Sequence, residues 1–287
     1  METQIGLALG GGGARALAHL GALIALEDAA IPIHCIAGSS MGAAIGAAKA
    51  IGADLKKIES ILGCLDLNDL LQVSDSTLRE VQRILGRGVM EYVRGSTWRE
   101  EDAKPQELAR LSEFFSLLTA NKSFDDTNIP FAVVATDVET GERVILDRGK
   151  LFHAVTASAA VPGVFSPVAW GGRYLVDGGI VEKLPVKAVI EMGANAILAV
   201  DAGAQPGRRA VETRLDALLQ THRTTSQHLT WLQLENARET VEGRMVVLRP
   251  DVARITMFGF EHTEEAIQAG KDVVRAHLDQ IRALVEA

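Results

Sequence analysis

The chain has 287 residues, of which 47% are hydrophobic and 23% are charged, values close to those of globular proteins. That length is enough for one large domain with a sizeable core. The composition excludes a disordered chain and a collagen-like repeat, and two cysteines are too few for a small protein held together by disulfides. The net charge of −8 argues against nucleic acid as a partner, because phosphate backbones attract basic faces.

No stretch reaches the roughly 20 apolar residues that span a bilayer. The N-terminus, Met1-Glu2-Thr3-Gln4, lacks the basic start of a signal peptide. The sequence therefore predicts a cytoplasmic protein and leaves open a peripheral contact with a membrane surface.

The first predicted elements repeat a strand–turn–helix plan. Short apolar runs are each followed by a glycine-containing turn and then by a helix rich in small residues. The segments are 5–9, 10–13 and 14–30 in the first unit, and 33–37, 38–42 and 43–50 in the second. Alternating strands and helices indicate a parallel sheet with helices on its faces.

Residues 54–126 form a predicted helical insertion that covers one edge or face of the sheet, with helical patches at 55–62, 77–85 and 107–119. Further strands are predicted at 131–136, 144–146, 173–176, 196–200 and 245–248. Further helices are predicted at 151–160, 185–192, 214–241 and 263–285. We expect one α/β domain over 1–287, with a C-terminal helical region from about 207 to 287 that includes one late strand.

The segment Gly38-Ser39-Ser40-Met41-Gly42 has the G-x-S-x-G pattern of a nucleophile elbow. An apolar strand leads in and a helix leads out, as such an elbow requires. The turn would lift the Ser40 hydroxyl to the carboxyl edge of the sheet, above a helix N-terminus where negative charge is favoured. A helix capped by Ser39 or Ser40 has the same letters, and the pentapeptide alone does not separate the two.

The run Gly10-Gly11-Gly12-Gly13 is open to two functional interpretations. Its spacing approximates a dinucleotide fingerprint, but that fingerprint expects an acidic residue about 20 positions further on. The alternative is an oxyanion hole, in which glycine amides face a tetrahedral intermediate. Both glycine turns would lie at the same edge of a parallel sheet, so they support each other as one site. Arg15 is expected either to add positive charge there or to lie in solvent.

A nucleophilic serine needs a base, and seven histidines are candidates. His262 stands where an α/β-hydrolase would place its histidine in chain order. None of the seven lies in a tight glycine turn or at a strand end that would fix its ring. No Cys/His cluster has metal-ligand spacing, so the sequence predicts no metal site.

Asp177 is the alternative base. It follows a strand-like run and precedes Gly178 and Gly179, which would hold the carboxylate in place and let another backbone approach. An ordinary Asp-Gly turn has the same sequence. Asp137 and Asp201 also follow apolar strands and are rivals.

Taken in order, these segments resemble the three motifs of the patatin-like phospholipases. The motifs are Gly10-Gly11-Gly12-Gly13-Ala14-Arg15, Gly38-Ser39-Ser40-Met41-Gly42 and Asp177-Gly178-Gly179, with supporting matches at 161–167 and Leu184-Pro185-Val186. The resemblance extends over residues 5–201. It departs from the family pattern at Ala16, where Gly is usual, and at Glu182-Lys183, where Asn-Pro or Asn-Asn is common.

The resemblance implies a three-layer α/β/α sandwich with a mainly parallel central sheet. It also implies a catalytic dyad without histidine, with Ser40 as nucleophile and Asp177 as base, and needs no cofactor and no metal. The amides expected in the oxyanion hole are those of Gly11, Gly12, Gly13 and Met41. The residues expected to support the site are Arg15, Gly38, Gly42, Gly178 and Gly179.

The sequence therefore predicts a serine acyl hydrolase that works through an acyl-enzyme on a lipid or another acyl ester. A thioesterase or a protease could use the same dyad. Two alternatives of other classes are a non-catalytic regulatory or scaffolding protein on the same fold and a nucleotide-binding module. The apolar residues 257–260 are expected either to line an acyl channel or membrane-facing lip, or to pack into the core.

Overall fold

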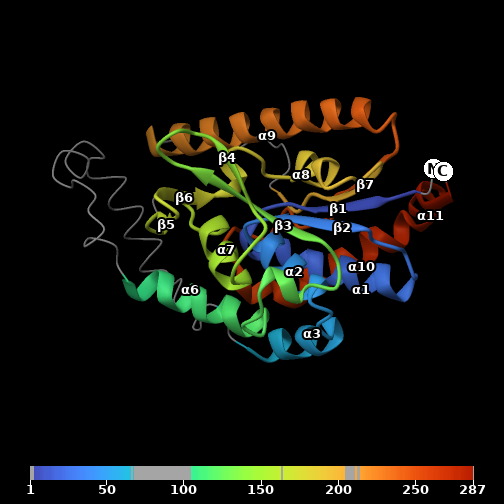
Figure 1. Cartoon of the computed structure of the whole chain (residues 1–287), viewed down its shortest axis with the longest axis horizontal. Helices are drawn as coiled ribbons and strands as arrows, with labels where there is room; N and C mark the ends of the chain where they lie inside the picture. Colours follow the sequence, from blue (N-terminus) through green and yellow to red (C-terminus); the bar gives the residue numbers. More distant parts are fainter. Residues whose placement is uncertain are drawn as a thin grey trace.

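The computed structural model describes residues 3–65, 67, 105–162, 164–203, 211 and 214–286. The predicted helical patch 77–85 and the rest of 68–104 lie outside these residues. Among the described residues, eight strands form one sheet in the order β5-β6-β3-β2-β1-β7-β8, with β4 also paired to β3. Figure 1 shows this sheet in the middle of the molecule, with helices above and below it.

Five of these strands run parallel, and the other three extend the sheet antiparallel beyond β3. The parallel strands are β1 (Ile5–Leu9), β2 (Cys35–Ser39), β3 (Phe131–Asp137), β7 (Ala196–Val200) and β8 (Met245–Leu248). The antiparallel strands are β4 (Arg143–Leu146), β5 (Val168–Trp170) and β6 (Arg173–Asp177). The predicted mainly parallel sheet is confirmed.

Helices cover both faces of the sheet (Figure 1). One face carries α8 (Val186–Glu191), with the long helix α9 (Arg214–Thr240) outside it. The other carries α1 (Ala18–Asp28), α2 (Met41–Ala50) and α7 (Leu151–Ser158), with α3 (Leu55–Cys64), α6 (Pro105–Leu118) and α10 (Thr263–Ala276) further out. Short 3₁₀ helices are η1 (Gly13–Leu17), η3 (Phe124–Asp126), η4 (Gly178–Ile180) and η5 (Phe260–His262), and α11 (Leu278–Glu286) packs near β8.

Two hydrophobic clusters fill the two interfaces between the sheet and its helices. Leu7 and Leu9 of β1 belong to one cluster and Ala8 to the other, as the alternation of side chains along a strand requires. The sheet is therefore buried on both faces, which explains why its parallel strands are continuous apolar runs. The predicted three-layer α/β/α sandwich is confirmed.

Several elements differ from the prediction, and β5 was not predicted at all. β2 begins two residues later than predicted and continues to Ser39, so the first two residues of the G-x-S-x-G motif belong to the strand. The predicted helix 14–30 begins as the 3₁₀ turn η1. The predicted final helix is broken at His277, whose Nδ1 lies 2.8 Å from the Val273 carbonyl oxygen while its amide bonds back to Val274.

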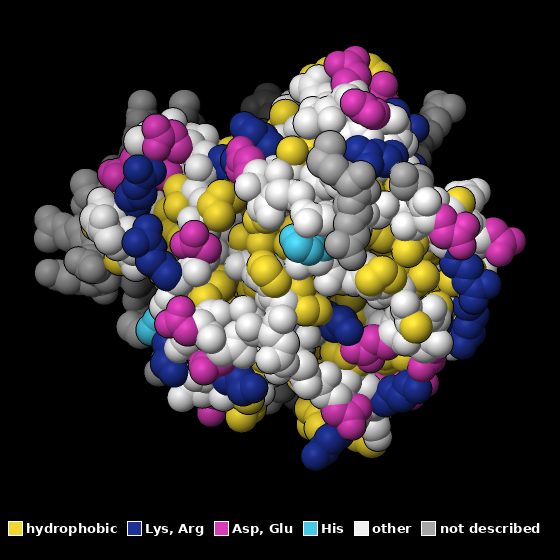
Figure 2. Space-filling view, turned by 45° about the vertical axis from the view of Figure 1, so that its right-hand side comes forward, with side chains coloured by type: hydrophobic (Ala, Val, Ile, Leu, Met, Phe, Trp, Pro, Cys, Tyr) yellow, Lys and Arg dark blue, Asp and Glu magenta, His cyan; other side chains and the backbone are white. Residues whose placement is uncertain are grey.

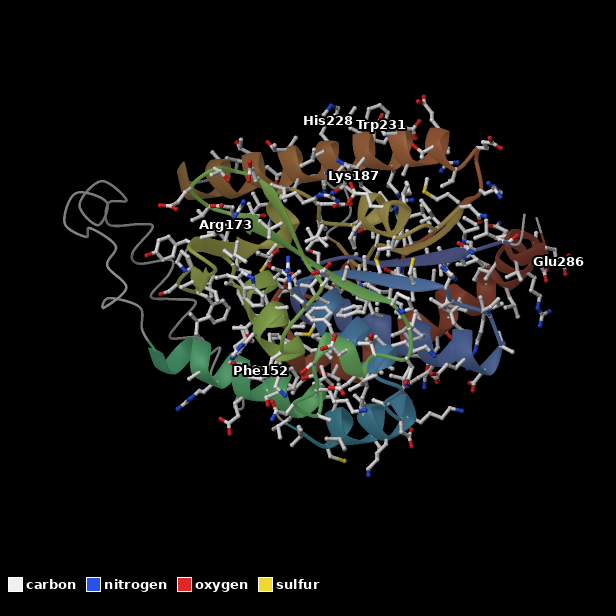
Figure 3. All side chains as sticks on the ribbon, in the orientation of Figure 1. Phe152, Arg173, Lys187, His228, Trp231 and Glu286 are labelled. Carbon is white, nitrogen blue, oxygen red and sulfur yellow. The ribbon has the colours of Figure 1, made fainter. Side chains whose placement is uncertain are left out.

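The surface shows no single-sign field on the face drawn in Figure 2, where acidic and basic side chains are interspersed with hydrophobic ones. Within the described ranges, no helix is long and apolar enough to cross a bilayer. Trp231, an exposed aromatic residue, stacks on His228, and both side chains lie on the outer side of α9 (Figure 3).

Helices α1 and α10 cross at two glycines. A Cβ on Gly21 would overlap the carbonyl oxygen of Ile267, and one on Gly270 would overlap that of Ala18. The two backbones are therefore in contact, and α10 packs directly behind η1. This contact joins the C-terminal region to the first strand–turn–helix unit, and the single domain over 1–287 stays a prediction.

We expect Gly270→Ala to destabilise the protein by about 2 kcal/mol or more, because the added methyl must push two helices apart. Gly63→Ala is the matched control. Gly63 is also in a helix, but its Cβ would meet only the end of Glu264 at 3.6 Å, so a gain of up to about 1 kcal/mol is expected from helix propensity. Urea unfolding of both variants measures the difference, and equal stabilities would contradict the proposed close crossing.

Candidate active site

Strand β2 ends in a turn that holds Ser40 in an unusual conformation. Its φ is 54° and its ψ is −129°, a region that residues with a side chain rarely occupy. The turn is tight, since a Cβ on Gly38 would lie 2.6 Å from the Ala43 nitrogen and one on Gly42 would lie 2.6 Å from the Gly10 carbonyl oxygen. Ser40 occupies the N-cap position of α2 but makes no side-chain capping bond. The geometry is that of an elbow that presents a hydroxyl.

The glycine turn after β1 lies beside this elbow, as the sequence predicts. β1 and β2 pair in parallel, with Leu9 opposite Gly38. A Cβ on Gly11 would lie 3.3 Å from the Cβ of Ser40. The two turns therefore meet at one edge of the sheet.

The amides of the glycine turn are not equivalent. Gly11 donates to the carbonyl oxygen of Lys183 at 2.9 Å, so its inclusion among the oxyanion-hole donors is wrong in this structure: the N–H already has an acceptor. Among the described hydrogen bonds, the amides of Gly12, Gly13 and Met41 have none. Those three amides are available to a negatively charged oxygen beside Ser40.

The pairing of the strands brings Asp177 level with Ser40. Ser39 pairs with Val134 of β3, and the next residue of β3, Ala135, pairs with Asp177 of β6. Ser40 and Asp177 therefore flank β3 on the same row, about two strand spacings apart at the backbone. The Thr136 hydroxyl donates to the Asp177 carbonyl oxygen at 2.9 Å and holds that strand end in place.

The carboxyl group of Asp177 faces the hydroxyl of Ser40. Burial raises the pKa of Asp177 to about 6, while hydrogen bonds from Ser40 and the Gly179 amide and the charge of Lys183 act in the opposite direction. The Gly179 amide lies 2.7 Å from Oδ1. Asp177 is thus a stronger base than an exposed aspartate, whose pKa is about 4.

The rival aspartates have structural partners. Asp137 pairs with Arg173 at 3.2 Å and accepts the Glu139 amide at 3.0 Å, which shapes the turn between β3 and β4. Asp201 accepts the Gly203 amide at 3.0 Å and lies 3.6 Å from Arg249. Neither contact involves the Ser40 turn.

His262 and His19 lie in opposite environments, one exposed and one buried. The side chain of His262 is 45% exposed, with Nδ1 3.2 Å from Glu265, so it lies on the surface. His19 is fully buried, and its Nε2 lies 2.7 Å from the Gly10 carbonyl oxygen. Burial lowers the pKa of His19 to about 4, so a neutral ring donates from Nε2 and supports the glycine turn from beneath.

Arg15 and the C-terminal loop are bound to each other behind the glycine turn. Arg15 is buried, and its Nη1 donates to the Ile255 carbonyl oxygen at 3.4 Å, so the alternative of a solvated Arg15 is wrong. The Ala14 amide donates to the Met257 carbonyl oxygen at 2.8 Å. Phe258 and Phe260 pack against the core, which is one of the two outcomes expected for this loop. Met257, in contrast, is 39% exposed and lies beside Gly13.

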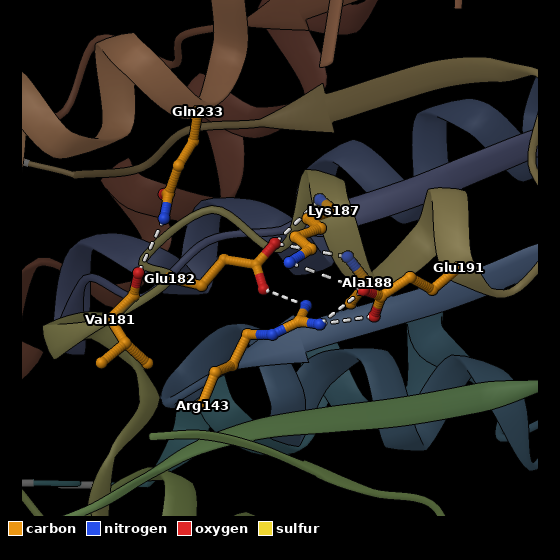
Figure 4. A network of polar contacts seen from close by, with 7 residues as sticks. All are labelled: Arg143, Val181, Glu182, Lys187, Ala188, Glu191 and Gln233. Atoms are coloured by element: carbon orange, nitrogen blue, oxygen red, sulfur yellow. Dashed lines mark hydrogen bonds and ion pairs between the residues drawn. The ribbon is translucent and has the colours of Figure 1, made fainter. Parts of the chain in front are cut away.

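Glu182 and Lys183, two of the three residues that depart from the family pattern, have different roles. Glu182 is 1% exposed, pairs with Arg143 at 2.7 Å and accepts the amides of Lys187 and Ala188 at the start of α8 (Figure 4). Lys183 accepts the Gly11 amide through its backbone, and its ammonium group lies close enough to Asp177 to lower the pKa of that carboxyl. Glu182 therefore stabilises the fold, while Lys183 faces the site.

Sequence reasoning missed one further group that contacts the site. Ser158, at the end of α7, accepts a hydrogen bond from the Ser40 amide at 2.8 Å. A serine inside a predicted helix gives no signal of such a contact, because the contact depends on how α7 packs against α2 and β3. The site combines a hydroxyl, a carboxyl group of raised pKa and amides without a described acceptor, which are the groups that an acyl-transfer reaction requires.

The sequence is similar to those of known proteins. A family model described as patatin-like phospholipase matches residues 7–190. An uncharacterized NTE family protein of Mycobacterium bovis is 31% identical over 199 residues, 69% of this chain and 49% of that protein. Lysophospholipase NTE1 of Cryptococcus neoformans is 30% identical over 200 residues, 70% of this chain and 11% of that protein. The chain thus spans half or less of the length of these curated relatives.

Comparison with solved structures addresses the fold alone. The crystal structure of VipD from Legionella pneumophila matches with a TM-score of 0.50 at 16% identity, covering 99% of this chain and 67% of that chain. At this identity the likeness shows a shared fold. It agrees with the layered architecture in Figure 1.

We expect the Asp177 carboxyl to titrate with a midpoint near pH 6 and Lys183→Met to move that midpoint to higher pH. The variant removes a positive charge that favours the ionised carboxylate. Lys187→Met is the matched control, since Lys187 is an exposed lysine of α8. A ¹³C NMR titration of the aspartate carboxyl carbons measures all three proteins. A Lys183→Met midpoint at or below that of the wild type would contradict the assignment.

Proposed function

The chain belongs to the patatin-like phospholipase family, and on that premise we propose that it hydrolyses acyl esters of lipids with Ser40 as nucleophile and Asp177 as general base. The observation that carries the proposal is the Ser40 hydroxyl facing a carboxyl group whose pKa burial raises to about 6. A lipid ester as substrate is supported by the family and by the similarity to a protein named lysophospholipase NTE1.

Acylation begins when Asp177 accepts the proton of the Ser40 hydroxyl as Oγ attacks the ester carbonyl carbon. The carbonyl electron pair moves to oxygen, and the resulting oxyanion accepts hydrogen bonds from the amides of Gly12, Gly13 and Met41. Collapse of this intermediate expels the alcohol, which takes the proton from Asp177. The acyl group remains on Ser40 as an ester.

Deacylation repeats these steps with water. Asp177 accepts a proton from a water molecule that attacks the acyl-enzyme, and Ser40 leaves with that proton. A base with a pKa near 6 is better matched to both proton transfers at neutral pH than one with a pKa near 4. Direct contact between Ser40 and Asp177 leaves no step for a histidine.

An apolar side chain, Met257, lies beside Gly13, which favours a lipid substrate. Met257 contacts Gly13 and keeps part of its side chain exposed. An acyl chain that extends from the ester carbonyl group, past Gly13, would meet the flexible, apolar side chain of Met257.

We expect Ser40→Ala and Asp177→Asn each to lower hydrolysis of a soluble ester and of a lysophospholipid by about 10³-fold or more. His262→Ala is the control and is expected to retain full activity. Labelling by a fluorophosphonate probe, lost in Ser40→Ala, separates this function from a non-catalytic scaffold. Thioester and peptide substrates in the same panel test the related hydrolase classes. Substantial ester hydrolysis by either dyad variant would overturn the assignment.

The pH dependence follows from the pKa of Asp177. The carboxylate must be ionised to accept a proton, so kcat/KM should be constant at neutral pH and fall as the pH drops through about 6. A steady-state profile between pH 4.5 and 8 measures this. A midpoint near 4 would mean that Asp177 is solvated in the working enzyme.

A further inference from the structure

The last turn of α7 and the two residues after it contact both members of the dyad through the backbone. Ser158 is fully buried and accepts a hydrogen bond from the Ser40 amide at 2.8 Å. Two residues later, the Ala160 carbonyl oxygen accepts the Asp177 amide at 3.0 Å. Residues 158–160 therefore join Ser40 and Asp177, which lie far apart in the sequence.

The orientation of the Ser158 hydroxyl is determined by its second hydrogen bond. Ser158 donates to the Val134 carbonyl oxygen at 2.6 Å, which uses its single proton and leaves its lone pairs for the Ser40 amide. The same carbonyl group abuts Gly178, where a Cβ would overlap it, and Val134 pairs with Ser39 in the sheet. The Val134 carbonyl group thus contacts both α7 and η4, at a residue of β3 that is in register with Ser39.

The Ser40 backbone needs such support. A residue with a side chain at φ 54° and ψ −129° carries a conformational cost of about 1–3 kcal/mol. Its amide precedes the first turn of α2, where no helical carbonyl is available. Ser158 supplies the acceptor, and an unpaired buried amide would favour relaxation of the turn.

Helix α7 is itself rigidly placed. Ala154, Val155 and Ala157 are completely buried, and α7 packs against β3, β6 and α2. In Figure 1 it lies under the sheet beside β3. A hydroxyl on this helix can therefore hold the elbow at a defined distance from the strand that ends in Asp177.

We propose that Ser158 is a positioning residue, whose hydroxyl holds the Ser40 turn in register with Asp177 and so determines the rate of serine attack rather than the affinity for substrate. The proposal rests on the function proposed above. Ser158 touches the backbone of Ser40, not the reacting atoms, and its described hydrogen bonds do not reach the Asp177 carboxylate.

The test compares Ser158→Ala with the wild type in ester hydrolysis and in the rate of fluorophosphonate labelling. We expect kcat and the labelling rate to fall by about 10- to 10²-fold, the cost of a small misplacement of a nucleophile. KM and the pH midpoint near 6 should be unchanged. Rates are expressed per folded molecule, with folding followed by circular dichroism.

Thr156→Val is the matched control. It removes another buried hydroxyl of α7, but this one donates to the Phe152 carbonyl oxygen of its own helix at 2.7 Å. Full activity is expected. Ser158→Thr restores a hydroxyl at the position and should recover most of the lost rate.

Ser158→Cys, a weaker donor and acceptor in nearly the same volume, replaces Ser158→Ala if the alanine variant does not fold, and a reduced labelling rate is again expected. Wild-type labelling rates in the folded variant, an equal loss in Thr156→Val, or a shifted pH midpoint would each overturn the proposal. A wild type that neither hydrolyses esters nor labels at Ser40 would overturn the proposed function and this inference together. Activity that depends on Ser40 but not on the Ser158 hydroxyl would overturn this inference alone.

Discussion

The backbone conformation of Ser40 is the constraint on which the rest of the site depends. A positive φ at a residue with a side chain is held only when the surroundings determine it. Three features do so here. The small residues Gly38 and Gly42 let strand, turn and helix approach closely, Ser158 accepts the amide, and the parallel partner β1 brings the glycine turn against the elbow. Each feature acts on the position of one hydroxyl.

The charge balance at Asp177 follows from the same packing. Packing at the sheet edge around Ser40 and Asp177 removes water from the carboxyl group, which raises its pKa and makes it a stronger base. Too large a shift would leave the group protonated at neutral pH. The Gly179 amide, the Ser40 hydroxyl and the Lys183 ammonium group oppose the shift. The site thus combines a low-dielectric environment with enough favourable contacts to keep a carboxylate.

The parts of the fold and site that the sequence predicts are those that depend on neighbouring residues, whereas contacts between distant segments could not be predicted. The glycine turn, the elbow and the Asp-Gly turn are local patterns, and each could be predicted from a few adjacent residues. The fold class follows from alternating strands and helices in the same way. The row that places Asp177 level with Ser40 depends on β6 running antiparallel to β3, which no local pattern reports. Ser158, the engaged amide of Gly11 and the buried Arg15 likewise depend on contacts between distant segments.

Hydrogen bonds connect the glycine turn to the C-terminal region of the chain. The Gly10 amide donates to the carbonyl oxygen of Val200 at the end of β7, and the Gly11 amide donates to that of Lys183 after η4. The Ala14 amide donates to the carbonyl oxygen of Met257. These anchored amides bracket Gly12 and Gly13, whose own amides have no acceptor among the described hydrogen bonds. Two of these acceptors, Val200 and Met257, and the Ile255 carbonyl group that binds Arg15 lie beyond residues 7–190, the range matched by the family model. The glycine turn therefore depends for its shape on a segment that follows the matched range, because that segment supplies acceptors for the amides on either side of Gly12 and Gly13.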